Sequence, residues 1–305
     1  MATPEEDADK IKEAMKGLGT DEDTIIDIIA NRTNAHRLEI GKIFEEKYGQ
    51  NIINELKSEL NGYFEDAAVA LFLSPIEYDV SQLKKAMKGA GTDEDTLIEI
   101  ICSRPTEYIQ KLKAKYKATY DKSLEEDVAD DTSGEFQYLL LELLKCERAE
   151  NEIPSHKVSY AKAKELVDEG EDNWSKKNSK FSQVFIKCSP MEIVMIAKYY
   201  NKLTGKTIIE TINEHFSGDV KETYKTILYA TISPSEFFAT KVRKAIEGWG
   251  TNDNLLIRIL VSRDEIDMPN IKRYYKQLYK SDLVEDVKAD TSGDYQKLLI
   301  KLIEK

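Results

Sequence analysis

A chain of 305 residues with 41% hydrophobic residues is long enough for two ordinary domains or an array of smaller units, and its composition excludes wholesale disorder. The net charge of −12 excludes a nucleic-acid binder, which needs clustered Lys and Arg to neutralise phosphates. The longest apolar run, residues 67–73, is too short to span a bilayer, and the acidic N-terminus is unlike a signal peptide. We therefore expect a cytoplasmic protein, and any phosphate-bearing partner needs a cation between it and this chain.

Apolar residues in the first 74 positions recur at helical spacing and predict five helices, whereas strand-like alternation is absent. The expected fold class is all-α. The predicted helices of this segment are, in chain order, one ending at Gly17 and Gly19, one capped by Thr20 with Asp23, one ending near Gly49, one closed by Gly62, and one over 67–73.

Two landmarks repeat along the chain. Met15-Lys16-Gly17-Leu18-Gly19-Thr20 returns 72 residues later as Met87-Lys88-Gly89-Ala90-Gly91-Thr92, and a third copy contains Gly248-Trp249-Gly250-Thr251. The second landmark, Asp131-Thr132-Ser133-Gly134, recurs as Asp290-Thr291-Ser292-Gly293. Both landmarks move by 159 residues between the second and the last copy, which leaves room for one more unit. We therefore predict four helical units, at 3–74, 75–146, 158–232 and 233–305, with 147–157 as a linker and a degenerate third unit.

The Gly-x-Gly loops carry the chemistry. A turn built on glycines exposes backbone carbonyls, and Ca²⁺ prefers six to eight oxygen ligands that include carbonyls and a carboxylate. An acidic residue lies 42 positions after the first glycine in all three intact copies, at Glu59, Asp131 and Asp290. A single Gly-x-Gly would be a common helix-connecting turn. Three copies with an acid at constant spacing favour a metal site.

These features resemble the annexins over essentially the whole chain. The resemblance rests on the four-unit layout, the Gly-x-Gly-Thr loops and the Asp-Thr-Ser-Gly segments, together with Ser103-Arg104 and Ser262-Arg263. It implies an array of four five-helix repeats that form a curved disc, with calcium loops on the convex face. It also implies calcium-dependent binding to anionic phospholipid membranes, with the protein peripheral on membranes when calcium rises.

The resemblance also implies the ligands of each site. The first site would use the carbonyls of Met15, Gly17 and Gly19 with Glu59, the second those of Met87, Gly89 and Gly91 with Asp131, and the last those of Ile246, Gly248 and Gly250 with Asp290. Weaker secondary positions match Thr20 with Glu22, Thr92 with Glu94, and Thr251 with Asp253. Predicted membrane contacts at the loop tips are Leu18, Ala90, Trp174 and Trp249.

The third unit departs from the pattern. Its loop reads Trp174-Ser175-Lys176-Lys177, and His215 stands where the acid is expected, so we predict poor calcium binding or none. Its net charge is +1 while the rest of the chain is near −13. We therefore hypothesise that Lys176, Lys177 and Lys180 contact anionic lipid directly. A second departure is Glu247, which stands at the position where the other two intact loops carry Lys16 and Lys88. Whether the last unit contacts lipid headgroups therefore stays open.

Two other classes of function were weighed against membrane binding. The same array would also suit a cytoskeletal or self-assembling scaffold with little calcium-dependent lipid binding. No arrangement of nucleophile and base indicates an enzyme, and no phosphate-binding loop or EF-hand occurs. Members of the resembling family often recruit partner proteins through a longer N-terminal tail, so we do not expect that here. Self-association on membranes stays open.

Overall fold

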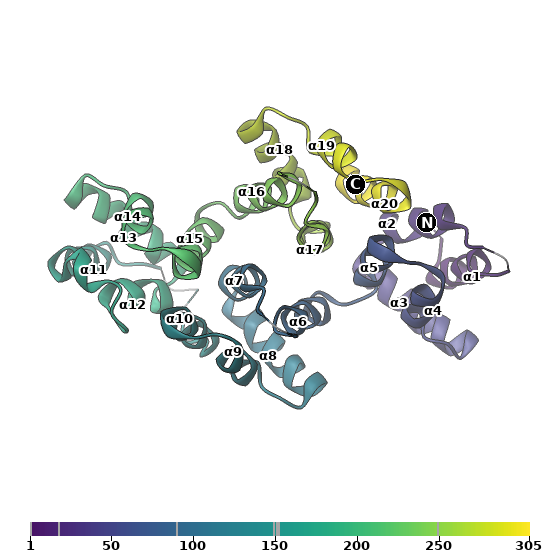
Figure 1. Cartoon of the computed structure of the whole chain (residues 1–305), viewed down its shortest axis with the longest axis horizontal. Coiled ribbons are helices and arrows are strands. Elements are labelled where there is room, and N and C mark those ends of the chain that lie inside the picture. The colour runs from purple at the N-terminus through teal and green to yellow at the C-terminus, as the bar shows by residue number, and fades with distance from the viewer. Residues whose placement is uncertain (1, 18, 90, 149, 151–152, 249) are drawn as a thin grey trace. The chain divides into compact units, whose positions relative to one another are not determined.

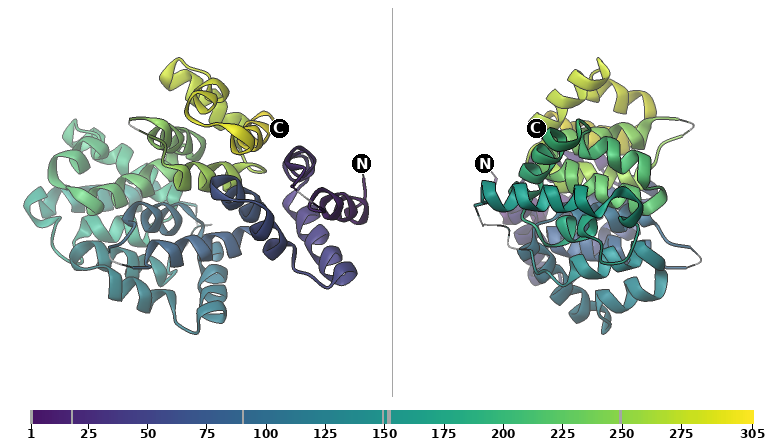
Figure 2. Two further views of the ribbon diagram at one scale, coloured as in Figure 1. Left: turned by 45° about the vertical axis from the view of Figure 1, so that its right-hand side comes forward. Right: turned by 90° about the vertical axis from the view of Figure 1, so that its left-hand side faces the viewer.

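The structure is a computed structural model of the whole chain, and it describes residues 2–17, 19–89, 91–148, 150, 153–248 and 250–305. Within these ranges the chain forms α-helices and one 3₁₀ turn, without a β-strand, and the expected all-α class is confirmed (Figures 1 and 2). The helices divide between two compact units. One contains the residues up to Tyr78 together with Ser235–Lys305, and the other contains Asp79–Pro234.

The first unit combines the two ends of the chain. Helix α2 packs against α20, and α5 packs against both α17 and α20. The helices up to Tyr78 are α1 (Pro4–Ala14), α2 (Glu22–Asn31), α3 (Asn34–Tyr48), α4 (Ile52–Glu59) and α5 (Gly62–Leu71). The later ones are α16 (Pro234–Ile246), α17 (Asp253–Arg263), α18 (Met268–Tyr279), α19 (Leu283–Asp290) and α20 (Gly293–Glu304).

The second unit is built from helices that follow one another along the chain. Helix α7 packs against α10 and α15, and α11 packs lengthwise on α13. Its helices begin with α6 (Pro75–Ala86), α7 (Glu94–Ser103), α8 (Thr106–Tyr120), α9 (Leu124–Asp131) and α10 (Gly134–Leu144). They continue with α11 (His156–Glu169), the 3₁₀ turn η1 (Glu171–Asn173), α12 (Lys180–Lys187), α13 (Pro190–Thr204), α14 (Ile208–His215) and α15 (Gly218–Ile232).

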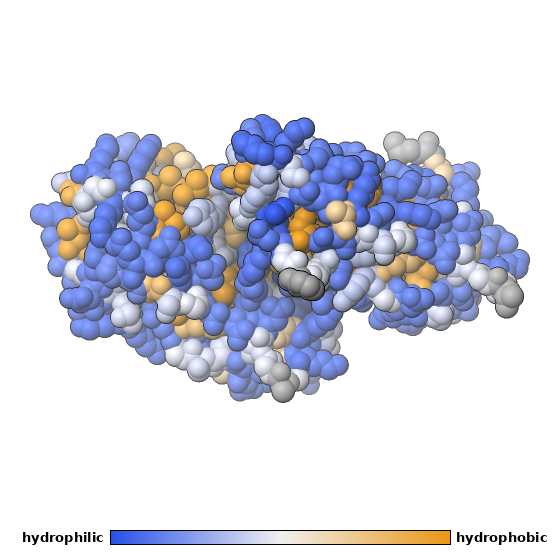
Figure 3. All heavy atoms as spheres, turned by 45° about the horizontal axis from the view of Figure 1, so that its top comes forward, coloured by the Kyte–Doolittle hydropathy of each residue, from blue (hydrophilic) through white to orange (hydrophobic). Residues whose placement is uncertain are grey.

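The apolar residues that predicted the helices form their cores. Ile11, Ile25 and Ile29 are fully buried, as are Ile40 and Phe44 of the third helix. Hydrophilic residues dominate the face drawn in Figure 3, and the hydrophobic residues on it lie in scattered patches.

Three predicted helix boundaries are wrong, one of them that of the fifth helix, which spans Gly62–Leu71 and not residues 67–73. The N-cap of α2 is Asp21, whose carboxylate accepts a hydrogen bond from the Thr24 N–H at 3.1 Å. Thr20, the predicted cap, instead contacts Glu59, as described below. Gly62 begins α5 with a φ of 60° rather than closing α4, which ends at Glu59. Gly49 is the predicted C-cap of α3, in the left-handed conformation.

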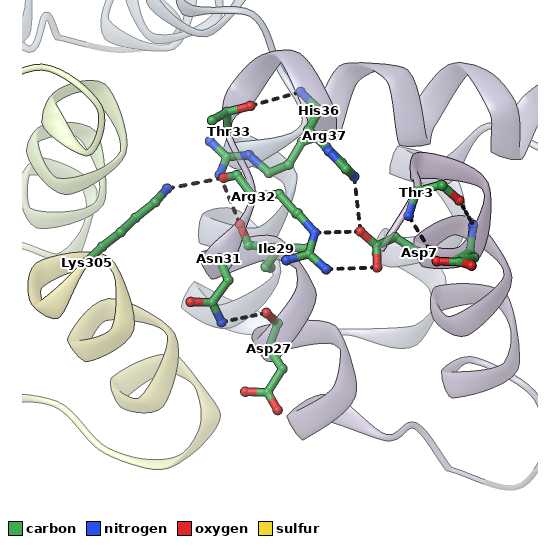
Figure 4. Close-up of polar contacts among 11 residues, drawn as sticks. Thr3, Asp7, Asp27, Ile29, Asn31, Arg32, Thr33, His36, Arg37 and Lys305 are labelled. Atoms are coloured by element: carbon green, nitrogen blue, oxygen red, sulfur yellow. Dashed lines mark hydrogen bonds and ion pairs between the residues drawn. The ribbon is translucent and has the colours of Figure 1, made fainter. Parts of the chain in front are cut away.

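A buried carboxylate ties the first three helices together (Figure 4). Asp7 of α1 accepts hydrogen bonds from Arg32, at the end of α2, and contacts His36 of α3 at 3.1 Å. Burial opposes the ionisation of Asp7, but the bonds and charges of Arg32 and His36 outweigh burial and lower its pKa. Arg37 donates a hydrogen bond to the carbonyl of Ile29 at 2.9 Å. This bond gives a partner to one of the carbonyls that have none within the helix at the C-terminal end of α2.

Candidate metal-binding loops

The three intact Gly-x-Gly loops share one backbone conformation. Gly17 and Gly19 have φ angles of 102° and 98°, and the matching glycines of the other two loops have φ angles between 86° and 118°. A residue with a side chain is strained at these angles. No atom lies within 4 Å of the place that a Cβ would take at any of these glycines. Glycine is therefore required by the backbone conformation rather than by crowding, and the space around the loops is open.

Each loop is closed by the same backbone hydrogen bond. The Asp21 N–H donates to the carbonyl of Ala14 at 2.8 Å. The corresponding bonds run from Asp93 to Ala86, at 2.9 Å, and from Asn252 to Ala245, at 2.7 Å. The side chain after this carbonyl is buried and anchors each turn, at Met15, Met87 and Ile246. The first predicted carbonyl ligand of each site therefore follows the same hydrogen-bonded carbonyl in all three loops.

Each predicted acid is the last residue of the fourth helix in its repeat: Glu59 of α4, Asp131 of α9 and Asp290 of α19. The loop threonine reaches this helix end. Thr20 Oγ1 donates to Glu59 Oε2 at 3.0 Å. Thr92 and Thr251 donate to the backbone carbonyls of Asp131 and Asp290, at 3.0 and 3.1 Å. The structure therefore brings each loop next to the acid that follows it by 42 residues.

The position of these acids favours a bound cation. A helix carries partial negative charge at its C-terminus, so a carboxylate there is electrostatically unfavourable. Within the described ranges the carboxylates of Asp131 and Asp290 accept no hydrogen bond and form no ion pair. A cation near the loop would offset both effects. Three carbonyls and one carboxylate are oxygen donors of the kind that Ca²⁺ prefers, so the residues present fit this ion.

The predicted secondary ligands lie beside the same sites. Glu22 and Glu94 begin α2 and α7, and Asp253 begins α17. Burial raises the pKa of Asp253, and the nearby negative charge of Asp290 raises it further. The negative charge that Asp290 places near Asp253 is a further reason to expect a cation in the last loop.

One turn before each acid, a side chain ties the fourth helix to its neighbours. Asp127 of α9 accepts hydrogen bonds from Lys84 of α6, at 2.7 Å, and from Tyr116 of α8. Burial opposes the ionisation of Asp127, but hydrogen bonds from Lys122, Lys84 and Tyr116 lower its pKa to about 2. Equivalent contacts join Asp286 to Tyr275 and Arg243, and Glu55 to Lys12. The sequence holds a signal for these positioning residues, since an acid stands four positions before each predicted ligand acid.

The third repeat has an internal contact at the equivalent place. Helix α14 ends at His215, and His215 Nε2 lies 2.7 Å from Glu171 Oε2 in the η1 turn that replaces the glycine loop. An imidazole suits a helix C-terminus better than a carboxylate does. One turn earlier, Thr211 donates to the Tyr200 hydroxyl at 3.1 Å in place of the charged contact. The sequence marked His215 as a substitution, but it did not indicate Glu171 as its partner.

The predicted membrane contact of Trp174 is contradicted by its burial. Trp174 is 1% exposed, and its ring stacks on Phe181 with centroids 4.7 Å apart. Tyr200 and His215 border the same ring, with centroids 6.0 and 5.8 Å away. Position in a loop does not fix the direction of a side chain, and here the aromatic partners of the same repeat hold the indole inside.

Lys176 and Lys177 remain at the surface beside this buried ring. Lys177 Nζ lies 5.2 Å from the ring centroid of Tyr138, and Lys180 pairs with Glu165 at 3.2 Å. The remaining predicted membrane contacts, Leu18, Ala90 and Trp249, lie outside the described residues.

Comparison with known proteins agrees with this architecture. A family model described as Annexin matches residues 6–71, 78–143, 161–227 and 237–302. Human annexin A11 is 41% identical over 299 residues, which cover 98% of this chain and 59% of annexin A11. Mouse annexin A13 is 41% identical over 297 residues, which cover 97% of this chain and 94% of annexin A13. The chain thus spans about three fifths of the length of the annexin A11 relatives that it matches.

Solved structures show the same similarity. Annexin III superposes with a TM-score of 0.96 at 35% identity, covering 100% of this chain and 94% of that one. Chicken annexin V gives a TM-score of 0.92 at 34% identity, covering 100% and 96%. Calcium-bound annexin (Sm)1 gives 0.87 at 30% identity, covering 99% and 90%.

An all-helical fold in which one family model matches four consecutive repeats defines the class of this protein. This chain belongs to the annexin family. In the part of the chain that the structure describes, none of the helices combines the length and the apolar character needed to cross a bilayer.

Proposed function

We propose that this chain attaches to anionic phospholipid membranes through Ca²⁺ held in the first, second and fourth repeats. The observation that carries the proposal is the contact between loop threonine and helix end, which places three loops beside three exposed acids. Calcium-bound annexin (Sm)1, a structural relative, supports the choice of ion.

The chain's own residues prepare each site. The glycines adopt positive φ angles without strain and have open space around them, and the fourth helix ends at the acid in each of the three repeats. When bound, Ca²⁺ would supply positive charge and open coordination positions for phosphate oxygens of the lipid. A chain with a net charge of −12 would otherwise be repelled by an anionic surface. We expect the protein to be cytoplasmic at low calcium and membrane-bound when calcium rises.

Cosedimentation with phosphatidylserine vesicles tests this proposal. The triple variant E59Q/D131N/D290N removes the carboxylate of every proposed site, and we expect it to lose calcium-induced pelleting. The control E46Q/E107Q/E304Q removes the same charge at exposed acids outside the loops and should pellet like the unmodified chain. Unchanged calcium dependence in the first variant would refute the proposed ligands. Pelleting that ignores chelator would favour the scaffold function instead.

The lysines of the third repeat give a second, calcium-independent contribution in this proposal. Lys176 and Lys177 are exposed, and each basic residue near an anionic surface contributes about 1 kcal/mol. Replacing Lys176, Lys177 and Lys180 by Ser should weaken vesicle affinity at fixed calcium. The same replacement at the exposed residues Lys10, Lys117 and Lys276 serves as the control. Equal affinities for the two variants would remove the lysines from the account.

A further inference from the structure

A groove in the second unit is lined by residues of the third repeat and of the segment before it. It has a volume of about 370 Å³ and is lined by α13, by Pro154, and by His156 at the start of α11. Met191, Val194 and Met195 form its apolar part, and Met191 is 62% exposed. The volume and the apolar lining are typical of sites for small ligands.

The other part of the groove is basic. Lys198 and Lys202 line it, and none of the lining residues that the structure describes carries a carboxylate, although the chain has 56 acidic residues. Lys202 Nζ lies 5.5 Å from the ring centroid of Tyr199, whose hydroxyl contacts His156 Nδ1 at 2.9 Å. Neither lysine has a carboxylate partner among the residues that the structure describes. An anionic group would therefore meet two available ammonium groups.

The start of α11 adds to this positive character. His156 is the first residue of this 14-residue helix, and the N-cap Ser155 makes no side-chain cap hydrogen bond. The first N–H groups of a helix have no partner within the helix, and they carry partial positive charge. The basic residues and this helix end act in the same direction.

The two parts of the groove follow each other along α13. Met191, Met195, Lys198 and Lys202 are spaced by four, three and four residues and so share one face of the helix. Eleven residues at the α-helical rise span about 16 Å. We propose that this groove binds a free fatty carboxylate, with its acyl chain on the methionines and its carboxylate between Lys198 and Lys202. Binding is independent of calcium, because the protein supplies the cations itself.

Isothermal titration calorimetry with dodecanoate, below its aggregation concentration and in the presence of chelator, tests the proposal. We expect one dodecanoate per chain, and an affinity that rises about fourfold for each methylene between decanoate and dodecanoate. Dodecanol, which has the same chain and no charge, should bind at least about tenfold more weakly, because two basic contacts are lost. The variant K198S/K202S should lose most of the preference for dodecanoate over dodecanol. The control K272S/K276S, on the third helix of the fourth repeat, should behave like the unmodified chain.

A second variant keeps the test independent of the lysines. M195E places a carboxylate in the apolar part and should weaken dodecanoate binding by at least about tenfold, while thermal unfolding monitors its folding. The proposal is overturned if dodecanoate does not bind, or if K198S/K202S binds it unchanged. It is also overturned if only an acidic amphipathic peptide or anionic vesicles bind in chelator, or if the lysine variant instead changes the oligomeric mass. Loss of vesicle binding in E59Q/D131N/D290N would leave this result unaffected, so the two proposals fail separately.

Discussion

At the scale of single residues, glycine conformation and carboxylate position decide what the loops can do. Gly89 has a φ of 102° with open space around it. Replacing Gly89 by Ala should cost about 1 kcal/mol or more of folding stability through backbone strain, and it should also weaken calcium binding. Urea unfolding with and without calcium measures both effects. K88A, at the neighbouring position, is the control, and equal stability of the two variants would contradict the strain argument.

The pKa of Asp127 leads to a prediction about pH. Its value of about 2 in the folded chain lies below the ordinary value of 3.8, so ionised Asp127 stabilises the fold above pH 3.8. This stabilisation is lost as the pH falls from about 3.8 to about 2. D127N should therefore lower the unfolding free energy by about 1–2 kcal/mol at pH 7, and the difference should shrink toward zero near pH 2. Denaturant unfolding over this pH range tests it, and a difference that does not depend on pH would contradict it.

Local patterns in the sequence predicted much of each loop, because backbone conformation and short-range spacing decide it. Gly49 as a helix cap followed from such a pattern, whereas Asp131 was selected by the constant spacing of 42 residues. The N-cap of α2 was misplaced by one residue, because both Thr20 and Asp21 can cap a helix and only the contact between Thr20 and Glu59 separates them. The burial of Trp174 could not be predicted, because it depends on residues brought together by folding.

At the scale of helices and loops, the third repeat has a packed turn where the other three repeats have a Gly-x-Gly loop. Trp174 fills the interior next to Phe181, and His215 closes the turn onto Glu171. W174A should therefore destabilise the protein by about 3–5 kcal/mol, as expected for the loss of a buried aromatic side chain. W174F should keep most of the stability. Thermal and urea unfolding give the comparison, and a small effect of W174A would show that the ring is not part of the core in solution.

The tryptophan correction also bears on the lysines of the same loop. With the indole inside, Lys176 and Lys177 are the exposed part of this turn. Contact between the third repeat and a membrane would therefore be electrostatic rather than by insertion, and it should weaken with salt.

At the scale of the whole molecule, the proposed function depends on three similar sites carried by one chain. Each site alone should bind weakly, and the first contact raises the effective concentration for the next. The single variants E59Q, D131N and D290N should each shift the calcium midpoint of vesicle binding upward, while the triple variant loses binding altogether. Calcium titrations of vesicle cosedimentation measure the shifts. If one single variant equals the triple variant, one site acts alone.

The fourth helices α4, α9 and α19 end in a carboxylate, whereas α14 ends in His215. Without an ion, the terminal carboxylates of these three helices oppose the helix dipole, and the last turns should fray more readily. Amide hydrogen exchange in these turns should slow when calcium is added, since a ligand stabilises the state that binds it. Exchange at the end of α14 should be unaffected by calcium, so the four otherwise equivalent repeats would respond to the ion as three and one.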